Sequence, residues 1–206
     1  MQVIHTNIPD ILILEPRVFK DSRGYFFESF SQREFDEKVA QPYCGHPIHF
    51  LQDNESMSSY GVIRGLHYQQ MPYTQTKIVR CVKGRVLDIA VDIRQGSPTF
   101  GQHVAVEISE ENHLQVFIPK GFAHGFAVLS DSAIFQYKCD CLYEPASEGG
   151  IQPLDPRLGI DWKINPAEAI LSDKDLARPC LYEMASDFHF EENLYEQRSN
   201  GIITAL

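Results

Sequence analysis

The sequence predicts an all-β protein whose strands form an antiparallel barrel or sandwich. Short runs of β-branched and aromatic residues recur from about Ile11 to Tyr143, as expected for strands. Turn-forming stretches separate these runs, and this spacing is typical of barrels and sandwiches. The runs are ILIL, YFFESF, VIRGLHY, KIVRCV, RVLDIAVDI, HVAVEI, LQVFI and SAIFQYKC, and the turns include DSRG at 21–24, KG at 83–84, GSP at 96–98 and PKG at 119–121.

One helix is predicted near the N-terminus. Ser31 and Glu34 have capping-box spacing, in which the serine side chain accepts a hydrogen bond from the backbone N–H three residues later. Phe30 and Phe35 flank this cap and are spaced to form the accompanying hydrophobic staple. We expect the helix to end near Ala40.

The chain is expected to form a single domain over residues 1–185, followed by a C-terminal extension over residues 186–206 that is partly mobile. Its 206 residues, 43% of them hydrophobic, suffice for one core but are few for two domains of ordinary size. After Tyr143 the composition turns to Pro, Asp, Glu and Ser and the alternation fades. This part is therefore predicted to wrap over the barrel as irregular segments.

Composition and charge argue against several functional classes. No run approaches the roughly 18 apolar residues that cross a bilayer, and the segment MQVIHTNIPD lacks the pattern of a signal peptide, so we expect a soluble, cytoplasmic protein. The net charge of -10 argues against binding to nucleic acid or anionic membranes, and an anionic ligand would need a local cationic pocket. The five cysteines include no CxxC pair, which argues against a disulfide framework or a structural zinc site.

Alternation along two of the predicted strands indicates which residues share a face. In SAIFQYKC, Tyr137 lies on the face of Phe135 and is predicted to point into the barrel. In RVLDIAVDI, the alternate residues Leu87, Ile89, Val91 and Ile93 share a face opposite Asp88 and Asp92. These two aspartates are therefore predicted to face solvent rather than to be catalytic.

Arg64 and His67 are polar residues within VIRGLHY, a strand that otherwise has the composition of a buried one. A regular strand would point them at opposite faces, and Gly65 between them could give them a common direction through a β-bulge. Taken alone, a histidine in an apolar strand is more often a hydrogen-bonded core residue than a catalyst. His67 is therefore a candidate only together with other polar residues.

A second polar cluster, PKGFAHG at 119–125, resembles the second motif of the cupin barrels, PxGxxH, in which the histidine usually binds a metal. The first cupin motif requires HxH and a carboxylate, yet Tyr68 and Gln69 follow His67, and Lys77 stands where an acidic ligand is expected. A lysine cation at that position opposes metal binding. We therefore predict no metal site.

Without a metal, the predicted interior would hold polar residues suited to removing a proton beside a carbonyl group. A histidine titrates near neutral pH and can accept a carbon-bound proton. A lysine or an arginine can stabilise the enolate oxygen, and a tyrosine can return a proton to the opposite face, as inversion requires. The set comprises Arg64, His67, Lys77, His124 and Tyr137.

Ordered segments along nearly the whole chain resemble the dTDP-4-dehydrorhamnose 3,5-epimerase family. They are IPDILILEPRVFKDSRGYFFESF, QDN at 52–54, VIRGLHYQ, KIVRCVKGRVLDIAVDIRQGSPTFG, IPKGFAHGF, the Tyr137–Lys138 strand, EGGI, DPRLGIDW and LSDKD. The resemblance implies a cupin-like jelly-roll barrel with a few short helices, a homodimer, and no cofactor. It also implies conversion of dTDP-4-dehydro-6-deoxy-D-glucose to dTDP-4-dehydro-L-rhamnose through enolate intermediates, a step of rhamnose biosynthesis for cell-wall polysaccharide.

The resemblance implies roles for individual residues as well. His67 would be the base, with Asp175 of LSDKD as its carboxylate partner, and Tyr137 would be the acid. A carboxylate bonded to imidazole fixes the tautomer of the ring and stabilises its charged form. Lys77 would steady the enolate oxygen, aided by His124. From the sequence alone, Asp175 would be interpreted as an exposed loop acid.

The other residues implied by the resemblance bind the nucleotide. Arg23 and Arg64 suit the diphosphate, because a guanidinium group pairs with phosphate oxygens through two parallel hydrogen bonds. Tyr143 would stack on thymine. The cations supply the local positive charge that an acidic chain needs to hold an anion. The implied set is Arg23, Glu28, Gln52, Asn54, Arg64, His124, Tyr143, Glu148 and Lys174.

Three alternatives stay open. Leu154 stands before DP, where many members of the family have an aromatic residue, and the chain extends further beyond LSDKD than shorter members. A mono-epimerase that inverts only one carbon is therefore the nearest rival. A cupin that only binds a sugar nucleotide would be favoured by loss of His67 or Tyr137, and both are present. A metal-dependent cupin is disfavoured by the missing HxH.

Overall fold

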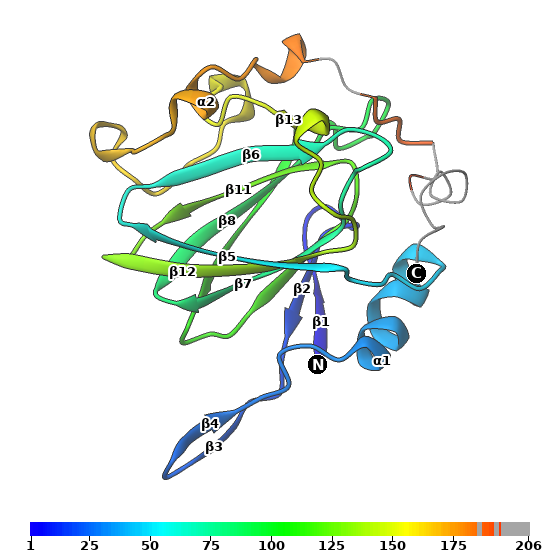
Figure 1. The fold of residues 1–206 in the computed structure, drawn as a ribbon, viewed down its shortest axis with the longest axis vertical. Coiled ribbons are helices and arrows are strands. Elements are labelled where there is room, and N and C mark those ends of the chain that lie inside the picture. Colours follow the sequence, from blue (N-terminus) through cyan, green and yellow to red (C-terminus); the bar gives the residue numbers. More distant parts are fainter. Residues whose placement is uncertain (185–186, 192–193, 195–206) are drawn as a thin grey trace.

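A computed structural model, which describes residues 1–184, 187–191 and 194, shows two antiparallel sheets packed face to face (Figure 1). The prediction of an all-β barrel with few short helices is confirmed. The six-stranded sheet contains, in spatial order, β1 (Gln2–His5), β2 (Leu12–Glu15), β10 (Gln115–Ile118), β7 (Lys77–Lys83), β12 (Ser132–Cys139) and β5 (Gln52–Ser59). The five-stranded sheet contains β13 (Glu148–Gly150), β6 (Ile63–Gln69), β11 (Phe122–Val128), β8 (Arg85–Asp92) and β9 (His103–Ser109).

A core of apolar side chains fills the space between the two sheets. Val79 and Phe135 come from the six-stranded sheet, and Val86 and Phe126 come from the five-stranded sheet. The rings of Phe126 and Phe135 stack with their centroids 4.1 Å apart. Tyr137 packs against this core, which confirms that it points into the barrel.

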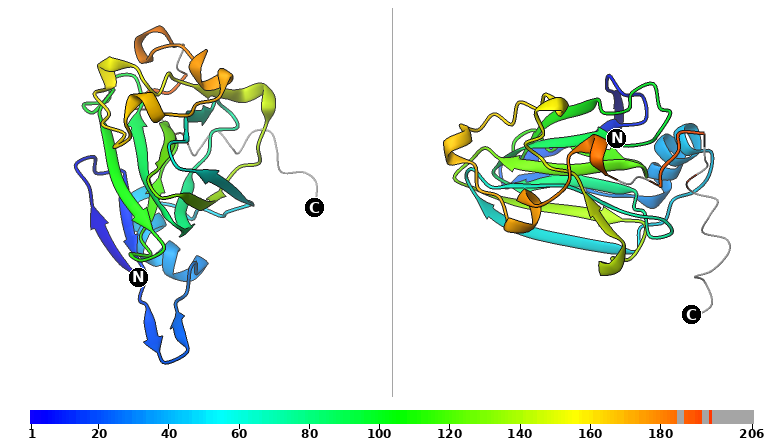
Figure 2. Two further views of the ribbon diagram at one scale, coloured as in Figure 1. Left: turned by 90° about the vertical axis from the view of Figure 1, so that its left-hand side faces the viewer. Right: turned by 90° about the horizontal axis from the view of Figure 1, so that it is seen from above.

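The segment after Tyr143 covers the outer face of the five-stranded sheet (Figure 2). It is irregular apart from β13, α2 (Asp173–Leu176) and single helical turns at Pro145–Ser147, Pro156–Leu158, Pro166–Glu168 and Leu181–Glu183. Trp162 and Leu181 of this segment pack on the sheet. No helix in the described part of the chain is long and apolar enough to span a bilayer.

Phe188, which belongs to the predicted extension 186–206, also packs on the barrel. Phe188 is fully buried, and its ring contacts that of Tyr68 edge-on at 5.7 Å. The Phe188 carbonyl accepts a hydrogen bond from the N–H of Gln95 at 2.8 Å. The extension was predicted to be partly mobile over residues 186–206, and residues 186, 192–193 and 195–206 of it lie outside the described residues, so its mobility stays a prediction.

The prediction that Asp88 and Asp92 face solvent is wrong, because both are buried, with 1% and 0% of their surface exposed. The alternation itself is correct. Leu87, Ile89 and Val91 of β8 point outward, where the segment after Tyr143 covers them. Since both faces of the strand are buried, its apolar face did not indicate which side meets water.

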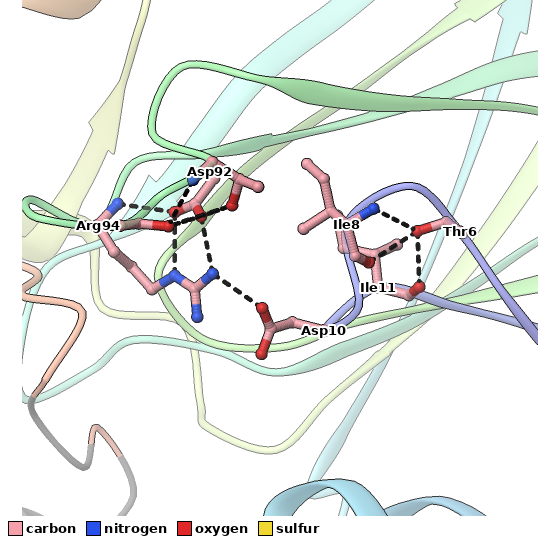
Figure 3. A network of polar contacts seen from close by, with 8 residues as sticks. Thr6, Ile8, Asp10, Ile11, Asp92 and Arg94 are labelled. Atoms are coloured by element: carbon pink, nitrogen blue, oxygen red, sulfur yellow. Dashed lines mark hydrogen bonds and ion pairs between the residues drawn. The ribbon is translucent and has the colours of Figure 1, made fainter.

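Asp92 anchors the turn that follows β8 (Figure 3). Its carboxylate accepts hydrogen bonds from Arg94 Nε at 2.9 Å, Ser97 Oγ at 2.6 Å and Thr99 Oγ1 at 2.7 Å. Burial alone would raise the pKa of Asp92, but these hydrogen bonds outweigh it and lower the pKa. Arg94 also donates to Asp10 at 3.0 Å, which ties this turn to the loop between β1 and β2.

The predicted helix begins where the sequence places it. In α1 (Gln32–Phe35), the Ser31 side chain accepts a hydrogen bond from the N–H of Glu34 at 3.4 Å. The rings of Phe30 and Phe35 lie 6.0 Å apart, as a hydrophobic staple requires.

The predicted helix end near Ala40 is wrong. The helix continues from Asp36 to Cys44 in a wider, π-type winding, with Val39 and Ala40 buried. It ends at Gly45, whose φ of 74° lies in the left-handed region that glycine adopts readily.

The hairpin of β3 (Phe19–Asp21) and β4 (Gly24–Phe26) stands apart from both sheets and projects away from the barrel (Figures 1 and 2). Its aromatic side chains are unusually exposed, with 70% of the Phe26 surface accessible. Such a group of exposed aromatic residues is typical of a surface that contacts another protein.

Candidate active site

A cavity of about 680 Å³ lies between the two sheets, and its rim includes residues of α2. Strands of both sheets and the segment after Tyr143 supply its lining. The polar lining residues are Asn54, Glu55, Ser56, Arg64, His67, Tyr68, Gln69, Gln75, Lys77, His124, Tyr137, Tyr143, Glu148, Ser172, Lys174 and Asp175. Ten of the thirteen site residues predicted from the sequence are in this lining, and Gln52 contacts two of its members.

A β-bulge brings Arg64 and His67 to the same cavity. Along β11, His124 pairs with His67 and Phe126 pairs with Arg64, so that two residues of β6 oppose one of β11. The bulge includes Gly65, whose φ is 138° and whose added Cβ would lie 2.6 Å from the Cα of Gly125. The predicted bulge is confirmed, and only glycine fits at position 65.

His67 is hydrogen-bonded to Asp175. Its Nε2 lies 2.5 Å from Asp175 Oδ1, and the backbone N–H of Asp175 donates to the Ser172 side chain at 3.1 Å. Burial would raise the pKa of Asp175, but the hydrogen bond with His67, together with Ser172 and the charge of Arg178, lowers it. An ionised Asp175 accepts the Nε2 proton and leaves the basic lone pair of His67 on Nδ1.

A second histidine, His124, is paired with Asp88, a residue that the sequence did not predict as part of the site. His124 Nε2 lies 2.8 Å from Asp88 Oδ2, and both residues are buried. Burial lowers the pKa of His124, and the neighbouring Asp88 opposes this shift. An aspartate between apolar residues in the middle of a strand was the signal that could have identified Asp88.

Lys77 and Tyr137 face the cavity from neighbouring strands of the six-stranded sheet. Lys77 Nζ lies 5.8 Å from the centre of the Tyr137 ring. Burial lowers the pKa of Lys77, although negative neighbours that include Asp88 and Glu148 oppose this. Burial raises the pKa of Tyr137, so its hydroxyl keeps its proton at neutral pH.

The cavity mouth is organised around Glu148. Its Oε2 accepts hydrogen bonds from the Tyr143 hydroxyl at 2.6 Å and from Lys174 Nζ at 2.7 Å. Gln52 accepts from the N–H of Tyr143 at 3.0 Å and donates to Asn54 at 2.8 Å. These contacts connect five of the nine residues to which the resemblance gives nucleotide binding, namely Gln52, Asn54, Tyr143, Glu148 and Lys174.

Three predicted residues do not line the cavity of their own chain: Gln52, which contacts two residues of the lining, Arg23 and Glu28. Arg23 lies at the tip of the projecting hairpin, with 88% of its side chain exposed and an ion pair to Asp21 at 2.5 Å. Glu28 lines a separate, small pocket near Phe30 and Gln115.

Among the described residues, no group of three or more His, Cys, Asp and Glu side chains is placed to hold a metal ion. Each cavity histidine is instead bonded to one carboxylate. His67 stands on the five-stranded sheet and Tyr137 on the six-stranded sheet. The cavity thus offers a proton acceptor on one side and a proton donor on the other.

Comparison with known proteins supports this interpretation. The family model of dTDP-4-dehydrorhamnose 3,5-epimerase matches residues 5–183. The enzyme of that name from Shigella flexneri is 54% identical over 177 residues, which are 85% of this chain and 93% of that protein. A crystal structure of a dTDP-6-deoxy-D-glucose-3,5-epimerase from Legionella pneumophila, in complex with dTDP-4-keto-L-rhamnose, is 48% identical with a TM-score of 0.84, over 89% of this chain and 94% of that chain.

A 3'-monoepimerase from Streptomyces bikiniensis, in complex with dTDP-quinovose, is also similar, at 37% identity and a TM-score of 0.79, over 87% of this chain and 88% of that chain. The fold and the site thus define a β-barrel epimerase, an enzyme of the isomerase class. More particularly, the chain belongs to the dTDP-4-dehydrorhamnose 3,5-epimerase family.

Proposed function

We propose that this chain converts dTDP-4-dehydro-6-deoxy-D-glucose to dTDP-4-dehydro-L-rhamnose by inverting carbons 3 and 5 through enolate intermediates, without a cofactor. The observation that carries the proposal is the His67–Asp175 pair facing Tyr137 across one cavity. Identity of 54% to a 3,5-epimerase, against 37% to a 3'-monoepimerase, supports inversion of both carbons.

In the proposed mechanism, His67 removes the proton from each carbon beside the 4-keto group. The lone pair on its Nδ1 accepts the proton, and the imidazolium that forms is stabilised by Asp175 at 2.5 Å from Nε2. One base can serve both carbons in turn, because they flank the same ketone, once His67 has released its proton to solvent and Tyr137 has regained one from solvent.

Lys77 stabilises the enolate oxygen. Its ammonium group lies in the cavity, and the burial that lowers its pKa makes it a better proton donor to an oxyanion. The lowered pKa of His124 favours a neutral ring whose Nε2–H donates to Asp88. We therefore assign His124 to substrate binding, as an aid to Lys77 rather than as a second cation.

Tyr137 returns a proton to the face opposite His67. It stands on the other sheet, and its raised pKa keeps the hydroxyl protonated. Delivery of the proton from the side opposite its removal inverts the carbon. Proton removal is thus assigned to His67 on the five-stranded sheet, and proton return to Tyr137 on the six-stranded sheet.

The nucleotide occupies the cavity mouth in this proposal. Arg64 binds the diphosphate and the ring of Tyr143 stacks on thymine, with Glu148 holding the Tyr143 hydroxyl. The other contacts come from Gln52, Asn54, Glu148 and Lys174.

We also propose a homodimer, in which the hairpin of one chain lies against the cavity of its partner. This arrangement would cover the exposed aromatic residues of the hairpin and bring Arg23 to the partner's diphosphate. It accounts for the position of Arg23 and Glu28 outside the cavity of their own chain.

The cytoplasmic location expected from the sequence belongs to the same proposal, and cell fractionation would test it.

Mixed dimers test this arrangement. Arg23→Ala and His67→Ala chains are each expected to be inactive alone, and co-expression should restore activity, because one site of the mixed dimer combines an intact His67 with the partner's intact Arg23. No rescue, in a sample shown to contain mixed dimers, would refute a contribution of Arg23 across the interface.

The proposed reaction is tested with the keto-sugar nucleotide itself. The purified protein should convert it to the 4-dehydro-L-rhamnose nucleotide, identified by nuclear magnetic resonance. A product inverted at one carbon only would identify a mono-epimerase, and binding without turnover would identify a non-catalytic cupin.

A further inference from the structure

Arg178 lies two residues beyond α2 and reaches back to β13. Its Nη2 donates to Glu148 Oε1 in a short ion pair, and both side chains are mostly buried, with 15% and 14% exposed. The backbone N–H of Arg178 donates to the carbonyl of Asp175 at 3.3 Å. Arg178 thus connects the end of α2, which carries Asp175, to the edge of the sheet that carries His67.

The side chain of Arg178 crosses β13 beside His67, with its Cδ and Nε next to Gly150. Gly150 is the register partner of His67, and a Cβ added to Gly150 would lie 2.9 Å from Arg178 Nε. The same Cβ would lie 2.9 Å from the carbonyl oxygen of Leu66. Glycine at position 150 therefore leaves the space in which the Arg178 side chain is seated.

The charge of Arg178 acts on Asp175. Burial would raise the pKa of Asp175, and the positive charge of Arg178 is one of the causes that lower it, after the hydrogen bond from His67. Lys174 binds the same Glu148 but differs in position, since it lines the cavity and 61% of its side chain is exposed. Arg178 is not among the residues that line the cavity.

We propose that Arg178 is a positioning residue for the His67–Asp175 pair, an inference that rests on the proposed role of His67 as the base. By joining the end of α2 to Glu148, Arg178 holds the Asp175 carboxylate against His67 and favours its ionised form. It does so without touching the substrate. Loss of Arg178 should therefore slow proton removal more than it weakens nucleotide binding, because Lys174 and Tyr143 still hold Glu148.

The test uses Arg178→Met, which retains an unbranched side chain over Gly150 and removes the charge. We expect kcat to fall about 10- to 100-fold, as is usual when a group that orients a reactive histidine is lost, with KM changed less than about threefold. The acid limb of the kcat–pH profile should move to higher pH, because removing a neighbouring positive charge makes the pair as a whole easier to protonate. Arg178→Lys, which keeps a charge, should recover part of the loss.

Arg157→Met is the matched control. Arg157 also pairs with a carboxylate in the same covering segment, donating to Asp155 at 3.0 Å, and it lies over the ring of Tyr182 away from the cavity. Its kcat should stay within about twofold of wild type, as for a substitution without a shared partner. Melting temperatures of all variants report any loss of folding.

A double-mutant cycle with Asp175→Asn separates positioning from general stability. If Arg178 acts through Asp175, Arg178→Met should change kcat by less than about threefold once Asp175 is already replaced. Wild-type kcat in Arg178→Met, or an equal loss in both backgrounds, would overturn the inference. Absence of proton exchange in the wild-type protein would instead refute the proposed function from which it starts.

Discussion

Replacement of Tyr137 by Phe should separate proton exchange from inversion. The substitution removes one hydroxyl and keeps the ring, which packs against the inter-sheet core and lies 6.2 Å from the ring of Phe135. A change that conserves volume in this way costs less than about 1.5 kcal/mol of stability. His67 is on the other sheet, and its hydrogen bond of 2.5 Å with Asp175 of α2 is not altered.

The expected magnitude follows from these positions. Loss of a general acid lowers the rate of the step it serves by about 100- to 10,000-fold, which corresponds to about 3 to 5 kcal/mol. Formation of inverted product should fall by that factor. Proton removal by His67 should persist within about tenfold, since the base, its carboxylate and Lys77 all remain. The intermediate would then recapture a proton mainly on the original face.

The assay follows the substrate in heavy water, with deuterium in recovered substrate measured by mass spectrometry and inverted product by nuclear magnetic resonance. Tyr182→Phe is a matched control, because Tyr182 is 62% exposed and lies outside the cavity. If exchange and inversion fall by the same factor in Tyr137→Phe, Tyr137 either supports enolate formation or is structural, and its assignment as the acid is wrong.

Two further predictions concern metal and acid. Dialysis against a strong chelator should leave activity unchanged, and reactivation by an added divalent ion would contradict the metal-free mechanism. Because the pKa of Asp92 is lowered in the folded state, its contribution to stability is present above the ordinary aspartate value of about 3.9 and is lost as pH falls through the lowered value. Urea denaturation should therefore show Asp92→Asn less stable than wild type at pH 7, with the difference shrinking below about pH 4. A difference that stays constant down to pH 2 would refute this.

The sequence predicts the strands whose residues favour β-structure. It does not predict strands such as β5 and β11, which form because of their contacts with adjacent strands. β5 (QDNESMSS) is polar because it lies at the edge of its sheet, with only one face toward the barrel. β11 contains His124 and Gly125 and was interpreted as a motif rather than as a strand. Gly125 is needed there because an added Cβ would lie 2.6 Å from the Arg64 carbonyl oxygen, a contact between two strands that one sequence cannot reveal.

The residues of the candidate site likewise fall into those that the sequence predicts and those that depend on tertiary contacts. His67, Lys77, His124 and Tyr137 could be gathered from motifs and alternation, and the resemblance added Asp175, which local sequence would place in an exposed loop. Asp88 was assigned to the wrong side, because the covering segment that buries the opposite face of β8 comes from residues more than 60 positions later.

Arg178 and Gly150 were also missed by the sequence analysis. Their importance depends on the approach of α2 to β13, and the two residues are separated along the chain by a long irregular segment. Neither belongs to a strand or helix pattern that predicts chemistry. Only the tertiary arrangement brings the Arg178 side chain beside the register partner of His67.

The central claim, that His67 removes protons at two carbons, is tested most directly by locating deuterium after turnover in heavy water. The wild-type protein should incorporate deuterium at both carbon 3 and carbon 5. His67→Ala should lose exchange at both by about 100- to 10,000-fold while binding the nucleotide nearly as well as wild type. Deuterium at a single carbon in the wild-type product, or a third of wild-type exchange in His67→Ala, would contradict the claim.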